Sequence, residues 1–128
     1  MPTFLRLPIS LLVMASCLGF VPPPATDQQL ILGTWVCETD KNWKLVFTKA
    51  ICTQYYSGQA SEVDRYTLSN TSPQCGEQVP VEESTSYLQL TQLSNKEVTC
   101  YELNGVTAKT LSLRPIHKGG ALVFIKQK

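Results

Sequence analysis

Residues 30–47, LILGTWVCETDKNWKLVF, decide the fold of this chain. Side chains alternate in residues 33–39 and again in 43–47, with the period of two that places every second residue on the same face of a strand. The polar residues 40–42 between the two runs suit a short hairpin loop. Folding the runs about Lys41 predicts three cross-strand pairs on one face, which are Thr39–Trp43, Cys37–Leu45 and Trp35–Phe47.

Similar short runs follow to the end of the chain, separated by residues that favour turns. With the first hairpin they predict an all-β fold, an eight-stranded antiparallel up-and-down β-barrel. In the hairpin about Asn95-Lys96, Leu88 is expected opposite Leu103 and Leu90 opposite Tyr101. No helix of more than a turn or two is expected. The further strands are expected at residues 51–56, 63–69, 86–93, 97–103, 109–114 and 121–126.

The first sixteen residues have the layout of a signal peptide, in which a single positive residue, Arg6, precedes an apolar core. The core ends in residues 14–17, Met-Ala-Ser-Cys. This junction resembles the lipobox of bacterial lipoproteins, where small residues precede a cysteine that receives the lipid. The resemblance implies that Cys17 is the lipid anchor. The alternative is an ordinary signal peptide with a chance cysteine in it.

Three prolines at residues 22–24 predict an extended polyproline spacer of roughly 3 Å per residue. Such a tether would hold a folded domain clear of a membrane surface. The remaining length is enough for one domain and not two. The expected organisation is a signal peptide at 1–16, a lipidated cysteine with a Pro-rich tether at 17–29, and the barrel domain at 30–128.

Gly33-Thr34-Trp35, just before the first strand, resembles the Gly-x-Trp signature of lipocalins. From about Leu30 onward the chain resembles the short lipocalin-like (calycin) lipoproteins of bacteria. The resemblance implies that Trp35 fills one end of the barrel. In lipocalins an Arg from a late strand stacks over this Trp, and Arg114 is the one arginine here that lies late enough. The alternatives are an exposed Arg114 and, for the fold, a β-sandwich with a Trp in its first strand.

Apart from Cys17, the chain has four cysteines, an even set that indicates two disulfides in an exported protein. Cys75, in a long irregular stretch, is expected to bridge to the outward-facing Cys100. Cys37 and Cys52 follow by elimination, but the second strand separates them by about 10 Å, beyond the limit of about 7 Å for a bridge. Either the turn is shifted, the barrel curls sharply there, or both are free buried thiols.

Lys and Arg number 11 and Asp and Glu number 10, with no basic run, which argues against nucleic-acid binding. The cysteines contain no C-x-x-C spacing, so no metal and no cofactor is expected. Nucleophile motifs and a Gly-rich phosphate loop are absent from the sequence. The single His117 and the adjacent Glu82-Glu83 are interpreted as solvated loop residues. We therefore expect a protein that is not an enzyme.

Inward-facing aromatic and aliphatic side chains form the expected lumen of the barrel. An apolar cup with a few polar tips suits a small hydrophobic ligand, and the alternative is that these side chains simply form the core. The expected lining residues are Trp35, Phe47, Tyr56, Tyr66, Leu68, Leu88, Leu90 and Tyr101.

The first functional expectation is a lipid-anchored lipocalin-like lipoprotein that binds a small hydrophobic molecule. Its expected location is the outer membrane, facing the periplasm, or the cell surface. The alternative is a protein-binding lipoprotein, an inhibitor of a cell-wall or host enzyme similar to the lysozyme inhibitors. Those inhibitors carry a Ser-Gly-x-x-Tyr loop, whereas residues 57–61, SGQAS, lack the Tyr. A filled lumen would remove the first expectation.

Overall fold

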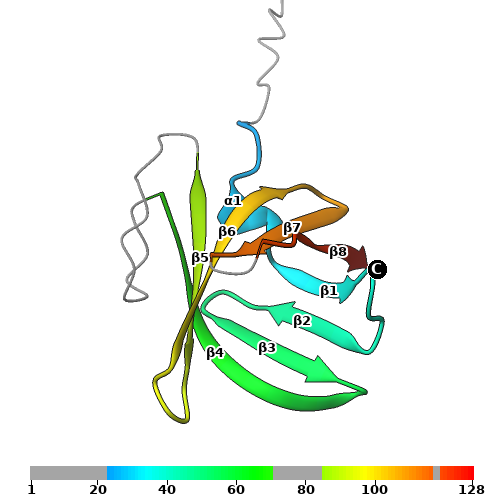
Figure 1. Cartoon of the computed structure of the whole chain (residues 1–128). Coiled ribbons are helices and arrows are strands. Elements are labelled where there is room, and N and C mark those ends of the chain that lie inside the picture. The colour runs from blue at the N-terminus through cyan, green and yellow to red at the C-terminus, as the bar shows by residue number, and fades with distance from the viewer. Residues whose placement is uncertain (1–22, 71–84, 117–118) are drawn as a thin grey trace, which may run out of the picture.

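Eight antiparallel strands and one short helix, α1 (Asp27–Leu30), make up the part of the chain that the structure describes (Figure 1). The structure is a computed structural model, and it describes residues 23–70, 85–116 and 119–128. In these ranges no helix has the length and apolar character needed to cross a membrane. The strands are β1 (Gly33–Cys37), β2 (Trp43–Phe47), β3 (Ile51–Tyr56), β4 (Gln59–Ser69), β5 (Ser86–Gln92), β6 (Val98–Val106), β7 (Thr110–Pro115) and β8 (Leu122–Gln127).

Each strand pairs with its neighbour in sequence, and β8 returns to pair with β1, so the sheet closes on itself. At the closing seam Val36 lies opposite Ile125 and Cys37 lies opposite Phe124. A closed sheet leaves no strand edge unpaired. The predicted eight-stranded up-and-down antiparallel barrel is confirmed, and the β-sandwich alternative is wrong.

The first hairpin has a longer loop than the sequence predicted. Trp35 lies opposite Leu45, so the expected pairs are displaced by two residues and the loop spans residues 38–42. Because the side-chain period of a strand is two, this displacement leaves the same side chains on the inner face. The hairpin of β5 and β6 shows the same displacement, with Leu88 opposite Tyr101.

Two turns differ from the prediction for reasons of backbone geometry. Ser57 and Gly58 have φ of 51° and 82°. Positive φ at both positions is typical of a type I′ turn, which connects strands tightly. β4 therefore begins at Gln59, earlier than expected. Asn104 and Gly105 are a pair typical of turns, but they lie inside β6, where the register shifts between Leu103 and Gly105 in a bulge.

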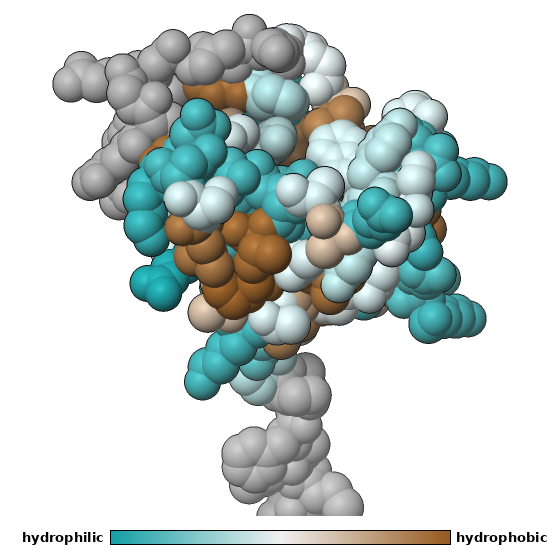
Figure 2. Space-filling model, turned by 90° about the horizontal axis from the view of Figure 1, so that it is seen from below, coloured by the Kyte–Doolittle hydropathy of each residue, from teal (hydrophilic) through white to brown (hydrophobic). Residues whose placement is uncertain are grey.

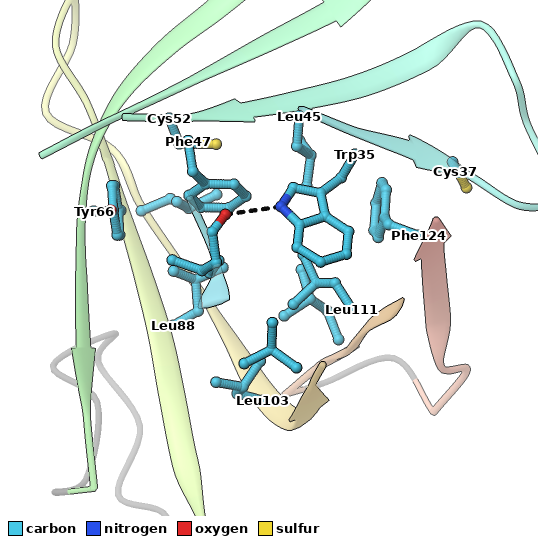
Figure 3. Close-up of a cluster of buried hydrophobic side chains, with 14 residues drawn as sticks. Trp35, Cys37, Leu45, Phe47, Cys52, Tyr66, Leu88, Leu103, Leu111 and Phe124 are labelled. Atoms are coloured by element: carbon cyan, nitrogen blue, oxygen red, sulfur yellow. Dashed lines mark hydrogen bonds between the residues drawn. The ribbon is translucent and has the colours of Figure 1, made fainter. Parts of the chain in front are cut away.

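Apolar side chains from the inner faces of the strands fill the barrel (Figure 3). Trp35, Phe47 and Phe124 are each at most 2% exposed. The ring of Phe47 meets that of Tyr66 edge to face, with centroids 5.0 Å apart. Trp43 and Phe124 make the same kind of contact at 5.1 Å. Such pairs contribute about 0.5–1.5 kcal/mol each beyond their buried area.

α1 closes one end of the barrel. Thr26 caps the helix through a capping box with Gln29. The next residue after the helix, Ile31, is fully buried, and its carbonyl accepts a hydrogen bond of 2.8 Å from Trp35 Nε1 (Figure 3). Gln28 donates to the hydroxyl of Tyr66 at 3.0 Å. α1 falls inside the segment expected as a tether, so the ordered fold begins before residue 30.

Lys126 of β8, and not Arg114 of β7, covers the indole of Trp35. Its Nζ lies 4.6 Å from the ring centroid and donates a hydrogen bond to the carbonyl of Leu32. Arg114 extends outward and pairs with Glu102 at 2.5 Å, with half of its side chain exposed. The prediction that Arg114 stacks on Trp35 is therefore wrong, because the alternation along β7 points this residue away from the core.

The strand order keeps Cys37 and Cys52 apart, because β2 lies between their strands. Cys37 and Cys52 are free and buried, so the alternative of two free buried thiols is confirmed and the disulfide between them is wrong. Cys52 lies opposite Phe47 on β3, and β2 separates it from Cys37, as the sequence predicted. Cys100 lies opposite Gln89 on the outer side of β6. Its expected partner lies outside the described residues, so the bridge between residues 75 and 100 stays a prediction.

Candidate functional site

Seven of the eight residues expected to line a ligand cup belong to the packed core or lie against it. Five of them, listed here, are buried: Trp35, Phe47, Tyr66, Leu88 and Leu90. Leu68 and Tyr101 are partly buried against this core. Tyr56, at the end of β3, is 52% exposed. The sequence therefore identified the inner face correctly, and most of that face is occupied by its own side chains.

A small void remains inside the barrel, and its volume is about 10 Å³. That space is close to what one water molecule needs. Its walls are Trp43, Leu45, Gln54, Leu90, Tyr101, Leu113, Leu122 and Phe124. Of the expected lining residues, only Leu90 and Tyr101 reach it.

Polar side chains gather between this void and the end of the barrel opposite α1, which we call the mouth. Nε2 of Gln54 donates to Glu62 Oε2 at 2.5 Å and to Asp64 Oδ2 at 3.0 Å. The indole Nε1 of Trp43 donates to Oε1 of the same Gln54 at 3.3 Å. We call Trp43, Gln54, Glu62, Asp64 and Tyr101 the mouth cluster.

The register of β3 and β4 brings the two acidic residues of the mouth cluster inside. Glu62 lies opposite Gln54, and Asp64 lies opposite Cys52. Both acidic residues share the inner face of β4 with Tyr66, at the period of two. Asp64 is 1% exposed and is the one buried charged residue of the described ranges. Sequence reasoning missed this pair, although the inward alternation of Tyr66 and Leu68 extends directly to it.

Burial and neighbouring negative charges raise the pKa values of several groups in and beside the mouth cluster. Partial burial, the hydrogen bond to Asp64 and the charges of Asp64 and Glu97 raise the pKa of Glu62 to about 7. Burial and the same two acidic residues of β4 raise the pKa of the Cys52 thiol, which keeps it protonated. Burial and these charges also raise the pKa of Tyr101. The cluster can therefore hold and release a proton near neutral pH.

A surface groove of about 420 Å³ borders the mouth cluster on its outer side. It lies between the hairpin of β3 and β4 and the connection from β5 to β6, where the Leu93 amide donates to the Val63 carbonyl at 3.0 Å. Its lining residues are Ala60, Ser61, Glu62, Val63, Gln92, Leu93 and Ser94. Near α1 a second groove, of about 450 Å³, is lined in part by Lys49 and Arg65.

Among the described residues, no group of three or more His, Cys, Asp or Glu side chains is placed to hold a metal ion. Within residues 23–70, 85–116 and 119–128, the hydrogen-bond partners of Glu62 and Asp64 include neither a histidine nor a hydroxyl nucleophile. Cys17, Glu82-Glu83 and His117 lie outside the described residues.

Comparison with models of protein families, with curated proteins and with solved structures gave no match. The barrel is compatible with a lipocalin-like fold, and the fold alone defines the class of this protein: a small, closed, eight-stranded up-and-down β-barrel. Function has to be argued from the site, because one fold hosts many activities.

Proposed function

We propose that this chain is a non-enzymatic binding protein that uses its barrel as a rigid scaffold and engages a protein partner through the outer surface at the mouth. The observation that carries the proposal is that the described side chains fill the lumen. The void of about 10 Å³ is far smaller than the roughly 300–1,000 Å³ of pockets that take small organic ligands. A surface binder needs no lumen.

The outer surface near the mouth supports the proposal further. Val63, Leu93 and Val98 are each 37–39% exposed, a high exposure for large apolar side chains. Leu93 and Val63 also line the groove of about 420 Å³. Figure 2 views the molecule from this end and shows hydrophobic side chains gathered in a patch among hydrophilic ones. Apolar groups surrounded by a polar rim are typical of protein interfaces.

The proposal includes a lipocalin-like family relationship and a lipid anchor. Gly33 and Trp35 at the closed end, with a basic side chain over the indole, support the lipocalin-like relationship. The Met-Ala-Ser-Cys junction supports a lipid on Cys17, which would place the barrel at the outer membrane, on its periplasmic side or at the cell surface. An inhibitor of a cell-wall or host enzyme is the kind of surface binder that we favour.

The test compares two variants of the protein purified from its own membranes. Leu93→Glu places a charge in the surface patch, whereas Leu90→Phe adds volume next to the internal void. We expect a protein partner to remain bound to wild type and to Leu90→Phe, and to be lost from Leu93→Glu, in native mass spectrometry. Equal circular dichroism spectra would establish that both variants are folded.

The opposite result would identify a lumen ligand. A small apolar molecule that stays with wild type and with Leu93→Glu but is expelled by Leu90→Phe would overturn the surface proposal. It would establish the small hydrophobic ligand that the sequence first suggested.

A further inference from the structure

Two carboxyl groups lie side by side inside the barrel wall at the mouth, and both accept from the same amide. Nε2 of Gln54 is 2.5 Å from Glu62 and 3.0 Å from Asp64. In the described part of the chain, neither carboxyl group has an ion-pair partner. Among the residues that the structure describes, the titratable groups that face the pair from other elements carry no positive charge; they are Glu97 before β6, Cys52 on β3 and Tyr101 on β6.

Two neighbouring carboxylates resist full ionisation, because each charge disfavours the other. A proton on Glu62 removes this repulsion and lets Glu62 donate a hydrogen bond to Asp64. Asp64 is 1% exposed, whereas Glu62 borders the surface groove. Glu62 is therefore the group through which the proton reaches solvent. Its pKa of about 7 places the exchange near neutral pH.

The hairpin beyond this pair is held by backbone contacts and buries few side chains. Tyr56 lies opposite Trp43, the Ser57 amide donates to the Asn42 carbonyl at 2.9 Å, and residues 56–61 are exposed. The register of β3 and β4 shifts between Gln54 and Tyr55, which interrupts the regular ladder there. On its other side, β4 lies opposite β5 from Asp64 onward, and the last contact before that point is the bond from the Leu93 amide to the Val63 carbonyl. Strand ends with few buried contacts open most easily.

We propose that Glu62 and Asp64 form a proton-operated latch at the mouth, in which one proton on Glu62 keeps the outer part of the β3–β4 hairpin closed and its loss releases that part. The proton leaves the carboxyl group of Glu62 for water. The Glu62 carboxylate, now beside the Asp64 carboxylate, turns into the groove, and Gln54 keeps its bond to Asp64. This inference is independent of the proposed protein partner.

The two tryptophans supply a built-in probe and its control. The indole N–H of Trp43 donates to Gln54 within the mouth cluster, whereas that of Trp35 donates to Ile31 at the closed end. In ¹H–¹⁵N spectra from pH 5.5 to 8.5, the Trp43 indole signal should titrate with a midpoint near 7. The Trp35 signal should not titrate. Trp43→Phe assigns the two signals.

Hydrogen exchange distinguishes opening of the hairpin from loss of the Glu62 proton without opening. If the opened hairpin leaves Glu62 solvated, its pKa there is the ordinary value of 4.5. The opening equilibrium should then rise about tenfold between pH 6 and pH 8. We therefore expect the protection factors of residues 55–61 to fall about tenfold over this range, after correction for the intrinsic exchange rate.

Glu62→Gln keeps the size of the side chain and has no proton to lose. The Trp43 signal should then no longer titrate, and the protection of residues 55–61 should no longer fall. His117→Gln, which removes the other group expected to titrate near neutral pH, should behave as wild type. If Glu62→Gln does not fold, Asp64→Asn should lower the midpoint toward that of an ordinary glutamate. A Trp43 signal that titrates while the hairpin keeps its protection would overturn the latch, as would a Glu62→Gln variant that titrates like wild type.

Discussion

The ammonium group of Lys126 lies 4.6 Å from the centre of the Trp35 ring and also donates to the carbonyl of Leu32. Lys126 belongs to β8 and Trp35 to β1, and the two residues lie opposite each other in the register. The contact therefore joins the last strand to the first, where the barrel closes.

Lys126→Met tests the contribution of this contact. Methionine keeps most of the apolar stem and removes the charge, so the variant loses a cation–π contact of about 0.5–2 kcal/mol. It also loses a charged hydrogen bond worth about 1.5–3 kcal/mol. Water replaces part of these interactions, so we expect urea unfolding to show a free energy of unfolding that is lower by about 1–3 kcal/mol.

Arg114→Met is the matched control for that experiment. Arg114 is half exposed and its ion pair with Glu102 lies at the surface. Exposed pairs contribute about 0–1 kcal/mol. If the two variants lost the same stability, or if Arg114→Met lost more, the assignment of Lys126 as the cover of Trp35 would fail.

Gly33→Ala should also destabilise the closed end. The φ of Gly33 is +124°, and an added Cβ would come within 2.7 Å of Cε and Nζ of Lys126. Backbone strain of this kind costs about 1–3 kcal/mol. Thermal denaturation should show a clear drop for Gly33→Ala and little change for Gly105→Ala, where nothing lies within 4 Å of the added atom. A wild-type midpoint for Gly33→Ala would contradict this reading of the site.

Alternation alone was enough to predict the barrel. The faces of Trp35, Leu45 and Leu88 are correct although both hairpin registers are displaced by two residues. A displacement by an even number preserves the face, so an error in loop length does not disturb the core. Strand order followed from the short connections, which bring consecutive strands together.

Alternation does not predict the contact of Lys126 with Trp35, and it did not lead to the mouth cluster. Lys126 contacts an indole far away in sequence, and only the register of β8 against β1 shows this. Acidic residues are almost never fully buried. Their residue type therefore does not predict Glu62 and Asp64 for the interior, although their spacing from Tyr66 places them on the inner face. Which side chains meet inside a barrel depends on the stagger of its strands, and the sequence does not display the stagger.

The stability of the barrel should fall as the pH rises through the range set by Glu62. Its pKa is raised from 4.5 to about 7 in the folded chain, so the folded state binds more protons than the unfolded state between these values. This contribution is complete below about pH 4.5 and is lost as the pH approaches 7. Urea unfolding of wild type against Glu62→Gln should show the difference in slope, and parallel pH profiles would contradict it.

Cys17→Ser should release the protein from membranes. A cysteine at the end of a signal peptide can carry lipid, and stable anchoring takes more than one acyl chain. Serine has no thiol to be modified. Fractionation of cells that express the variant should move the protein to the soluble fraction, and intact mass should show the lipid on wild type only. Membrane association that persists in Cys17→Ser, or a mature N-terminus elsewhere, would refute the anchor.

The remaining cysteines should show two kinds of chemistry. Cys37 and Cys52 are free and are each at most 1% exposed. Burial and nearby negative charge raise the pKa of the Cys52 thiol, which removes the reactive thiolate. We therefore expect both thiols to resist a thiol reagent in the folded protein and to react fully in denaturant.

The expected bridge between Cys75 and Cys100 closes a loop of about 26 residues and should stabilise the fold by about 3 kcal/mol. Peptide mapping without reductant should yield this linked pair together with unlinked peptides for Cys37 and Cys52. A reductant should lower the thermal midpoint of wild type and leave that of Cys75→Ser unchanged. A peptide that joins Cys75 to Cys37 or to Cys52 would contradict the bridge to Cys100. It would also contradict the free state of the cysteine that is joined.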